Sequence, residues 1–132
     1  MNAAAHRPDP RRRVLIVEDE AAICDLMADA LRLADFEPEC VSTDKAARDR
    51  LRRKGFAAVI LDINLGAGET GFDVARFARM QSPGVAVLYV TGQASESSFR
   101  AFGVPGSRFM AKPFLPDELV RGLHVLLGAN DS

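Results

Sequence analysis

The sequence has few of the residue types on which metal, redox and many catalytic sites depend. It has no tryptophan, one tyrosine, two histidines and two cysteines in 132 residues. His6 and His124 have no partner at the spacing of metal ligands or of a catalytic pair, so we expect both on the surface and no zinc. Cys24 and Cys40 are expected to be small buried apolar residues, in preference to a disulfide or a metal site.

Long apolar runs and an excess of charge of one sign are also lacking. No run approaches the roughly 20 residues that cross a bilayer, and residues 1–13 lack the apolar stretch of a secretory signal. Lys and Arg number 17 against 18 for Asp and Glu, and the net charge of −1 gives no electrostatic reason to expect nucleic acid or a membrane surface as a partner. We therefore expect a cytoplasmic protein, with residues 1–12 as a disordered, arginine-rich tail.

What the sequence does contain is a regular alternation of apolar runs and helical patterns. Runs such as AAVIL and VAVLYV are continuously apolar, which is typical of parallel strands covered on both faces. The predicted strands are 14–18, 37–42, 56–62, 85–91 and 108–112. The predicted helices are 20–34, one capped by Ser42 or Thr43 and closed at Gly55, 72–81, 95–102, and one that begins at Pro116 and ends before Gly128.

Five strands alternating with five helices predict one doubly wound α/β domain of the (βα)5 type. Right-handed crossovers place helices on both faces of a parallel five-stranded sheet, for which we expect the order 2-1-3-4-5. The domain is expected to span residues 13–128, with 129–132 as a short C-terminal tail. No repeat or second domain is visible, so we expect no appended effector domain.

Polar residues come directly after the predicted strands, at the sheet edge where doubly wound domains bind ligands. Glu18 and Asp19 follow the first strand, Asp62 the third, Thr91 the fourth and Lys112 the fifth. Converging carboxylates favour Mg²⁺, which prefers oxygen ligands and lets an anionic phosphoryl donor approach. Asp62 is then a candidate nucleophile for an aspartyl phosphate, with Lys112 and the Thr91 hydroxyl stabilising the phosphoryl oxygens.

Each of these residues also has an ordinary explanation. Asp19 could cap the helix that begins near Glu20, Asp62 could be a turn residue, and Lys112 could simply be exposed. Taken together, these explanations require four strand ends to match by chance the pattern that one chemistry needs. We therefore reject them for the set.

The motifs that carry these residues resemble the receiver domain of two-component response regulators. They are VEDE, LDINL, VTG and KPF, in this order along residues 13–128, and the resemblance implies a flavodoxin-like fold. It implies that Asp62 receives a phosphoryl group from a histidine kinase, a phosphotransfer protein or a small phosphodonor. It also implies that Mg²⁺ is held by Asp19 directly, by Glu18 through water, and by Asp62 and the backbone carbonyl of Asn64.

The resemblance assigns further roles around the phosphoacceptor. Thr91 and Phe109 turn inward together, the Lys112–Pro113 peptide is cis, and Asn64 and Gln93 tune the lifetime of the phosphate. A switch face formed by the fourth helix, fifth strand and fifth helix would bind the downstream target protein. Residues of that face are expected to include Phe109, Arg121 and His124.

Some positions depart from the pattern of the family. Gly66 stands where the family often has proline, and Gly71 comes one position later than the usual glycine. Phe109 replaces the frequent tyrosine, from which we expect an inward bias before phosphorylation. Leu115 stands where Ser or Thr would cap the last helix better.

Several functions remain in competition. The main prediction is a single-domain response regulator that catalyses only its own phosphorylation and dephosphorylation, with a protein partner as output, or a phosphate sink or intermediate in a phosphorelay. A phosphorylation-independent interaction module is the first alternative. A flavin-binding module would need a Ser/Thr/Gly-rich loop where this chain has EDE, and an aspartate-nucleophile phosphatase would need an acid at Asn64.

Overall fold

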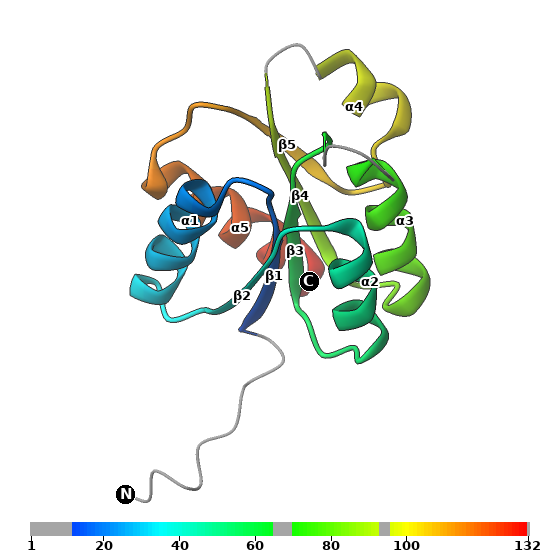
Figure 1. Ribbon diagram of the computed structural model, residues 1–132, viewed down its shortest axis with the longest axis horizontal. Helices are drawn as coiled ribbons and strands as arrows, with labels where there is room; N and C mark the ends of the chain where they lie inside the picture. Colours follow the sequence, from blue (N-terminus) through cyan, green and yellow to red (C-terminus); the bar gives the residue numbers. More distant parts are fainter. Residues whose placement is uncertain (1–11, 65–69, 93–95, 132) are drawn as a thin grey trace, which may run out of the picture.

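The computed structural model describes residues 12–64, 70–92 and 96–131, with side chains described as far as residue 128. Strands and helices alternate along this part of the chain (Figure 1). The strands are β1 (Arg13–Val17), β2 (Glu37–Val41), β3 (Ala58–Leu61), β4 (Ala86–Thr91) and β5 (Arg108–Ala111). The helices are α1 (Ala21–Leu33), α2 (Asp44–Arg52), α3 (Gly71–Gln81), α4 (Glu96–Phe102) and α5 (Pro116–Asp131). Every predicted element is present, and most bounds differ by only a residue or two.

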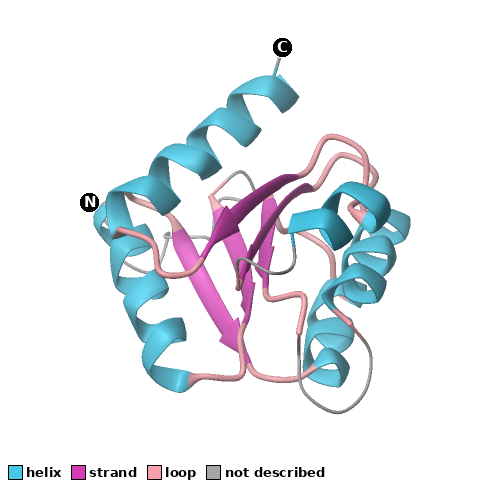
Figure 2. Cartoon of the chain, turned by 90° about the horizontal axis from the view of Figure 1, so that it is seen from above, coloured by secondary structure: helices cyan, strands magenta, loops and turns pink. Residues whose placement is uncertain are grey.

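All strands are parallel, and the sheet has the predicted order β2-β1-β3-β4-β5. Helices α1 and α5 cover one face, while α2, α3 and α4 cover the other (Figures 1 and 2). The pleat divides β1 between the two layers: Ile16 packs toward α1 and α5, and Leu15 packs toward α2 and α3. Burial on both faces explains why the strands are apolar at successive positions.

The last helix runs further than the sequence predicted. We expected α5 to end before Gly128, but it continues to Asp131. Glycine costs about 1 kcal/mol relative to alanine inside a helix, which weakens a helix without ending it. A Cβ at Gly128 would have no neighbour within 4 Å, so no packing interrupts the helix at this position.

Arg12, which we expected in the tail, belongs to the folded domain. Its guanidinium donates hydrogen bonds to the carbonyls of Asp35 (2.8 Å) and Ala34 (2.7 Å), beyond the end of α1. It also lies 4.2 Å from the centre of the Phe36 ring. These contacts satisfy carbonyls that the end of a helix leaves without partners. The remainder of the predicted tail, including His6, lies outside the described residues.

The expectation for the cysteines is wrong, because Cys24 and Cys40 form a disulfide. Cys24 is buried as predicted, but Cys40 is exposed on β2. The chain leaves β1, runs through α1 and returns as β2, which lies beside β1, so the start of α1 lies against β2. The two Cα atoms are consequently 6.3 Å apart, within the range that a disulfide spans.

Two smaller expectations can be checked on this fold. His124 is exposed on α5, as predicted, with its ring 5.5 Å from that of Phe36. Among the helices of the described segments, none has the length and apolar character needed to cross a membrane.

Candidate functional site

The strand ends bring four of the predicted site residues into direct contact. Lys112 Nζ donates hydrogen bonds to Glu18 Oε1 at 2.8 Å and to Asp62 Oδ2 at 2.9 Å. Thr91 Oγ1 donates to the other oxygen of Asp62, Oδ1, at 2.7 Å. One lysine therefore joins the acid after β1 to the acid after β3, and the last residue of β4 orients the second acid.

Backbone hydrogen bonds continue the sheet just beyond the strands and fix these residues in place. The Glu18 N–H donates to the Val41 carbonyl of β2, and the Asp62 N–H donates to the Val17 carbonyl of β1. The Lys112 N–H donates to the Thr91 carbonyl at 2.8 Å. The side chains of the site thus project from backbone that is still part of the sheet, which gives them a rigid support.

Burial and charge pairing act against each other at this edge. Glu18 is 2% exposed and Asp62 is 8% exposed. Burial raises the pKa of Glu18, although hydrogen bonds from Lys112 and the Glu20 N–H partly offset the effect. Burial alone would lower the pKa of Lys112, but its hydrogen bonds to Glu18 and Asp62 outweigh burial and raise it. The lysine is therefore held as a cation between two acids.

The acids after β1 form a group that suits a hard divalent cation. Carboxylate oxygens of Glu18, Asp19 and Glu20 all lie within 4.8 Å of one another, with Glu18 buried and the other two exposed. A cation there would have oxygen ligands on the protein side and open access to water, which is the environment that Mg²⁺ prefers. Glu20 was not among the predicted ligands, although its place in the EDE run was the available signal.

Asp62 and Asn64, the other two predicted metal ligands, do not belong to this group of three acids. Asp62 lies outside the group, and both of its carboxylate oxygens accept hydrogen bonds from protein donors. Asn64 is exposed and contacts Asp62 through its backbone N–H, which donates to Oδ1 at 3.0 Å. The role of the Asn64 carbonyl as a ligand stays a prediction, and Gln93 lies outside the described residues.

Gly71, the late glycine of the sequence pattern, packs directly against the backbone of Asp62 and Ile63. Its N–H donates to the Ile63 carbonyl at 2.8 Å. A Cβ at this position would lie 2.8 Å from Ile63 Cα and 2.9 Å from the carbonyl carbon of Asp62, which is closer than real Cβ contacts allow. The start of α3 can therefore approach Asp62 only with glycine at this position. Gly66, the other departure in this loop, is outside the described part.

A row of aromatic rings connects β5, α4, β4 and α3. Phe109 is partly buried against the α2 and α3 side of the core, and its ring centre is 5.6 Å from that of Phe99 on α4. Phe99 in turn contacts Tyr89 of β4 at 5.7 Å, and Tyr89 contacts Phe72 of α3 at 5.3 Å. Sequence reasoning identified Phe109 but missed Tyr89 and Phe99. The inward bias of Phe109 relative to a phosphorylated state stays a prediction.

The connection that follows β5 has the features that the motif KPF implied. The Lys112–Pro113 peptide is cis, as predicted. The side chain of Leu115 cannot cap the helix. Its backbone N–H donates a hydrogen bond to Glu118 Oε1 at 2.8 Å. Glu118 thus supplies the half of a capping box in which the third helical residue accepts from the N-cap N–H, while the acceptor that Ser or Thr would provide is missing.

Comparison with known proteins agrees with this geometry. Residues 14–124 match the family model of the response regulator receiver domain. The chain belongs to this family, for which phosphorylation and dependence on Mg²⁺ are general properties.

Relatives and solved structures give the same result. The cell cycle response regulator CtrA of Brucella ovis is 28% identical over 116 residues, which cover 87% of this chain and 50% of that protein. The chain thus spans about half the length of this relative. A response regulator receiver protein from Sinorhizobium medicae superposes with a TM-score of 0.85 at 29% identity, covering 89% of this chain and 95% of that one. A CheY-like receiver domain protein from Methanospirillum hungatei gives 0.80 at 26%, covering 91% and 96%.

Proposed function

We propose that this chain is a Mg²⁺-dependent phosphorylation switch in which Asp62 accepts the phosphoryl group. The observation that carries the proposal is the set of donors around one carboxylate: Thr91 and the Asn64 N–H contact Oδ1, and Lys112 contacts Oδ2. Three donors from three connections hold a nearly buried carboxylate in one orientation, which is what a nucleophile in a displacement reaction needs.

The reaction assigns a role to each of these groups. A carboxylate oxygen of Asp62 forms a bond to phosphorus while the bond from phosphorus to the donor breaks. The donor is a phosphohistidine of a kinase or phosphotransfer protein, or a small acyl phosphate. Lys112 and the Thr91 hydroxyl, both already directed at this carboxylate, stabilise the phosphoryl oxygens. A Mg²⁺ held by the acids after β1 would neutralise negative charge between donor and acceptor.

The output of the switch is proposed to be a protein contact. The face made by α4, β5 and α5 carries partly buried Phe109 and exposed Arg121, so it offers both apolar and polar groups to a partner. His124, which we expected on this face, lies with its ring against Phe36. We place the domain in the cytoplasm, with transfer along a phosphorelay as a further role for the same aspartyl phosphate. The near-zero net charge favours a protein over nucleic acid as the partner of this domain.

Intact-mass spectrometry after incubation with acetyl phosphate tests the proposal. We expect a gain of about 80 Da that requires both Mg²⁺ and Asp62 and is lost in Asp62→Ala. Asp25→Ala is the matched control, because Asp25 is an exposed aspartate on α1 away from the donors described above. No gain in the wild type, together with no binding of beryllofluoride, would favour a receiver fold that acts as an interaction module without phosphorylation.

A further inference from the structure

The start of α1, directly after the acidic group, has little noncovalent support. The Glu20 N–H donates to Glu18 Oε2 at 3.2 Å, but the Glu20 side chain, at the N-cap, makes no capping hydrogen bond, and the first turn has no acidic residue. Residues 21–22 are exposed, Ile23 is only partly buried against the core, and Cys24 is the first buried residue of the helix. Since helix ends without capping partners fray, another contact is needed to hold this turn against the sheet.

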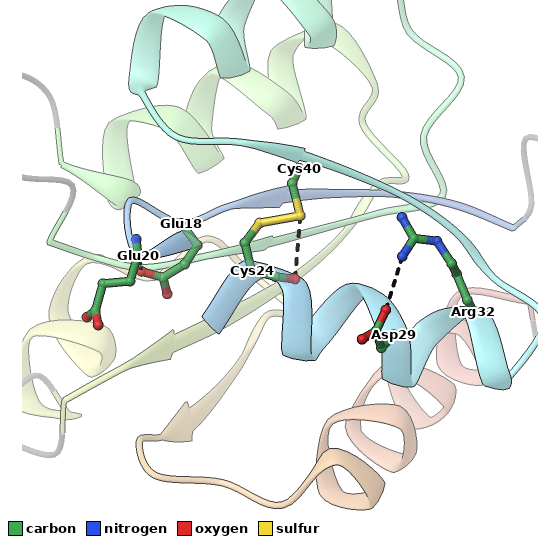
Figure 3. The surroundings of a disulfide bond; sticks show 6 residues. All are labelled: Glu18, Glu20, Cys24, Asp29, Arg32 and Cys40. Atoms are coloured by element: carbon green, nitrogen blue, oxygen red, sulfur yellow. Dashed lines mark hydrogen bonds and ion pairs between the residues drawn. A yellow bond between two sulfur atoms is a disulfide. The ribbon is translucent and has the colours of Figure 1, made fainter. Parts of the chain in front are cut away.

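The disulfide supplies that contact. Figure 3 shows the bond from Cys24, near the start of α1, to Cys40 on β2, with Glu18 and Glu20 beyond the N-terminal end of α1. On β2, the residue after Cys40 is Val41, whose carbonyl accepts the Glu18 N–H at 3.0 Å. Residues 18–24 are thus attached to β2 at both ends, by a hydrogen bond at one and a covalent bond at the other.

The two sulfur atoms differ in access. Cys24 is 4% exposed, whereas Cys40 is exposed on β2, which forms one edge of the sheet. Disulfides are opened by attack of a thiolate along the S–S axis, and access decides which sulfur is attacked. An external thiolate therefore reaches the sulfur of Cys40, and the sulfur of Cys24 is the leaving group.

We propose that Cys24 and Cys40 form a reversible thiol–disulfide site, opened by a dithiol reductant at Cys40, whose redox state controls the order of the acidic segment 18–24. A thiolate of the reductant bonds to Cys40 and displaces Cys24, which takes up a proton. The second thiol of the reductant then displaces Cys40, which also takes up a proton. Two electrons pass to the protein, and the dithiol becomes a disulfide.

The change is local because the rest of α1 has its own anchors. Met27 and Leu31 are 1% and 0% exposed and pack in the core between α1, α5 and the sheet. Reduction leaves these contacts intact and removes only the tether at the start of the helix.

After reduction, Glu18 stays tied to Asp62 through Lys112. Asp19 and Glu20, the exposed acids of the segment, lose a fixed position relative to Asp62. The sheet keeps its structure. This inference does not depend on the proposed phosphorylation.

The chemical half of the inference is tested by thiol trapping in folded protein. The protein is equilibrated in mixtures of reduced and oxidised dithiothreitol and then alkylated. Intact-mass spectrometry gives the number of alkyl groups per chain. We expect none or two alkyl groups per chain, with both thiols appearing in one transition. If no thiol reacts after hours in about 10 mM dithiothreitol, the bond is permanently closed and the inference is wrong. Two reactive thiols under oxidising conditions would contradict it equally.

The structural half is tested by hydrogen–deuterium exchange in the two redox states. We expect the amides of residues 18–24 to exchange at least about tenfold faster after reduction, with those of β3 and β4 unchanged. The Cys24→Ser/Cys40→Ser double variant should exchange at the rates of the reduced wild type, and adding reductant should not change those rates. Unchanged exchange in 18–24 would contradict the coupling. Acceleration throughout β3 and β4 would show global unfolding and would also contradict a local switch.

Discussion

Helices α1 and α3 are the helices that follow the two strands after which the acids of the site lie, but their starts are fixed by different means. At α3, Thr70 and Asp73 form a reciprocal capping box, in which each side chain accepts a hydrogen bond from the backbone N–H of the other residue. At α1, no side chain caps the helix and a disulfide ties Cys24 to the sheet. The start of α3, on the Asp62 side of the site, is therefore held by hydrogen bonds, and the start of α1, on the acidic side, by a bond that redox chemistry can break.

Removing Lys112, which joins Glu18 to Asp62, should have the largest effect, and this effect is on the rate of phosphorylation. Lys112→Met deletes the donor shared by Glu18 and Asp62, and the loss of one such electrostatic group in a phosphoryl-transfer site costs about 100-fold in rate. We expect phosphorylation by acetyl phosphate, followed by intact mass, to slow by about this factor. Lys45→Met is the control, because Lys45 is exposed on α2, and this variant should be phosphorylated at the wild-type rate. A rate within about twofold of wild type would reduce Lys112 to a structural ion pair.

Breaking the tether of α1 should have the next largest effect, this time on stability. Cys24 and Cys40 are 16 residues apart in the sequence, and closing a loop of that size stabilises a folded chain by about 3 kcal/mol in the chain-entropy model. Urea unfolding with and without dithiothreitol should show a loss of this order. The Cys24→Ser/Cys40→Ser variant provides the reference, because its midpoint should not respond to the reductant.

Replacing the N-cap residues of α1 and α3 by alanine should change the unfolding free energy by different amounts. Thr70→Ala removes a side-chain acceptor at the N-cap of α3 and should cost about 1 kcal/mol in urea unfolding. Glu20→Ala, at the N-cap of α1, removes no capping bond and should change the unfolding free energy by less than about 0.5 kcal/mol. Equal losses in the two variants would contradict the difference described above.

The smallest expected effect is a pH dependence confined to α3. The Thr70 hydroxyl, then the Thr70 N–H and Arg76, hold the pKa of Asp73 below its ordinary value. A carboxyl with a lowered folded pKa adds stability above its unfolded pKa, and that stability is lost as the pH falls through the folded value. The cost of Thr70→Ala should therefore shrink below about pH 4. A cost that stays constant from pH 7 to pH 3 would exclude Asp73 as the cause.

The sheet and the central contacts of the site were predictable because each depends on local pattern. Continuous apolar runs identified the strands, and the first polar residue after a run located Glu18, Asp62 and Lys112. Parallel strands place those residues at one edge by geometry alone, so their contacts follow once the strand order is known. The order itself was expected for a doubly wound domain, and the match of motifs to one family agreed with it.

The features that sequence missed depend on distances that no local pattern encodes. Cys24 and Cys40 are ordinary residues until α1 folds back and brings their Cα atoms to 6.3 Å. The sequence around Arg12 is typical of a polar tail, yet its guanidinium donates hydrogen bonds to two carbonyls beyond the end of α1. In both cases tertiary geometry overrode an expectation that was reasonable for the isolated segment.

Helix α4 differs from its neighbours in having no buried residue among its seven. Its aromatic contact with the sheet is made by Phe99, whose ring and carbonyl lie so close to Gly103 that a Cβ there would be 2.7 Å from the carbonyl oxygen. Detaching such a helix exposes little apolar surface, so its local unfolding free energy is a small part of that of the domain. Phe99 touches Tyr89, two residues before Thr91 on β4. The least costly movement in the described fold is thereby connected, through one ring contact, to the strand that orients Asp62.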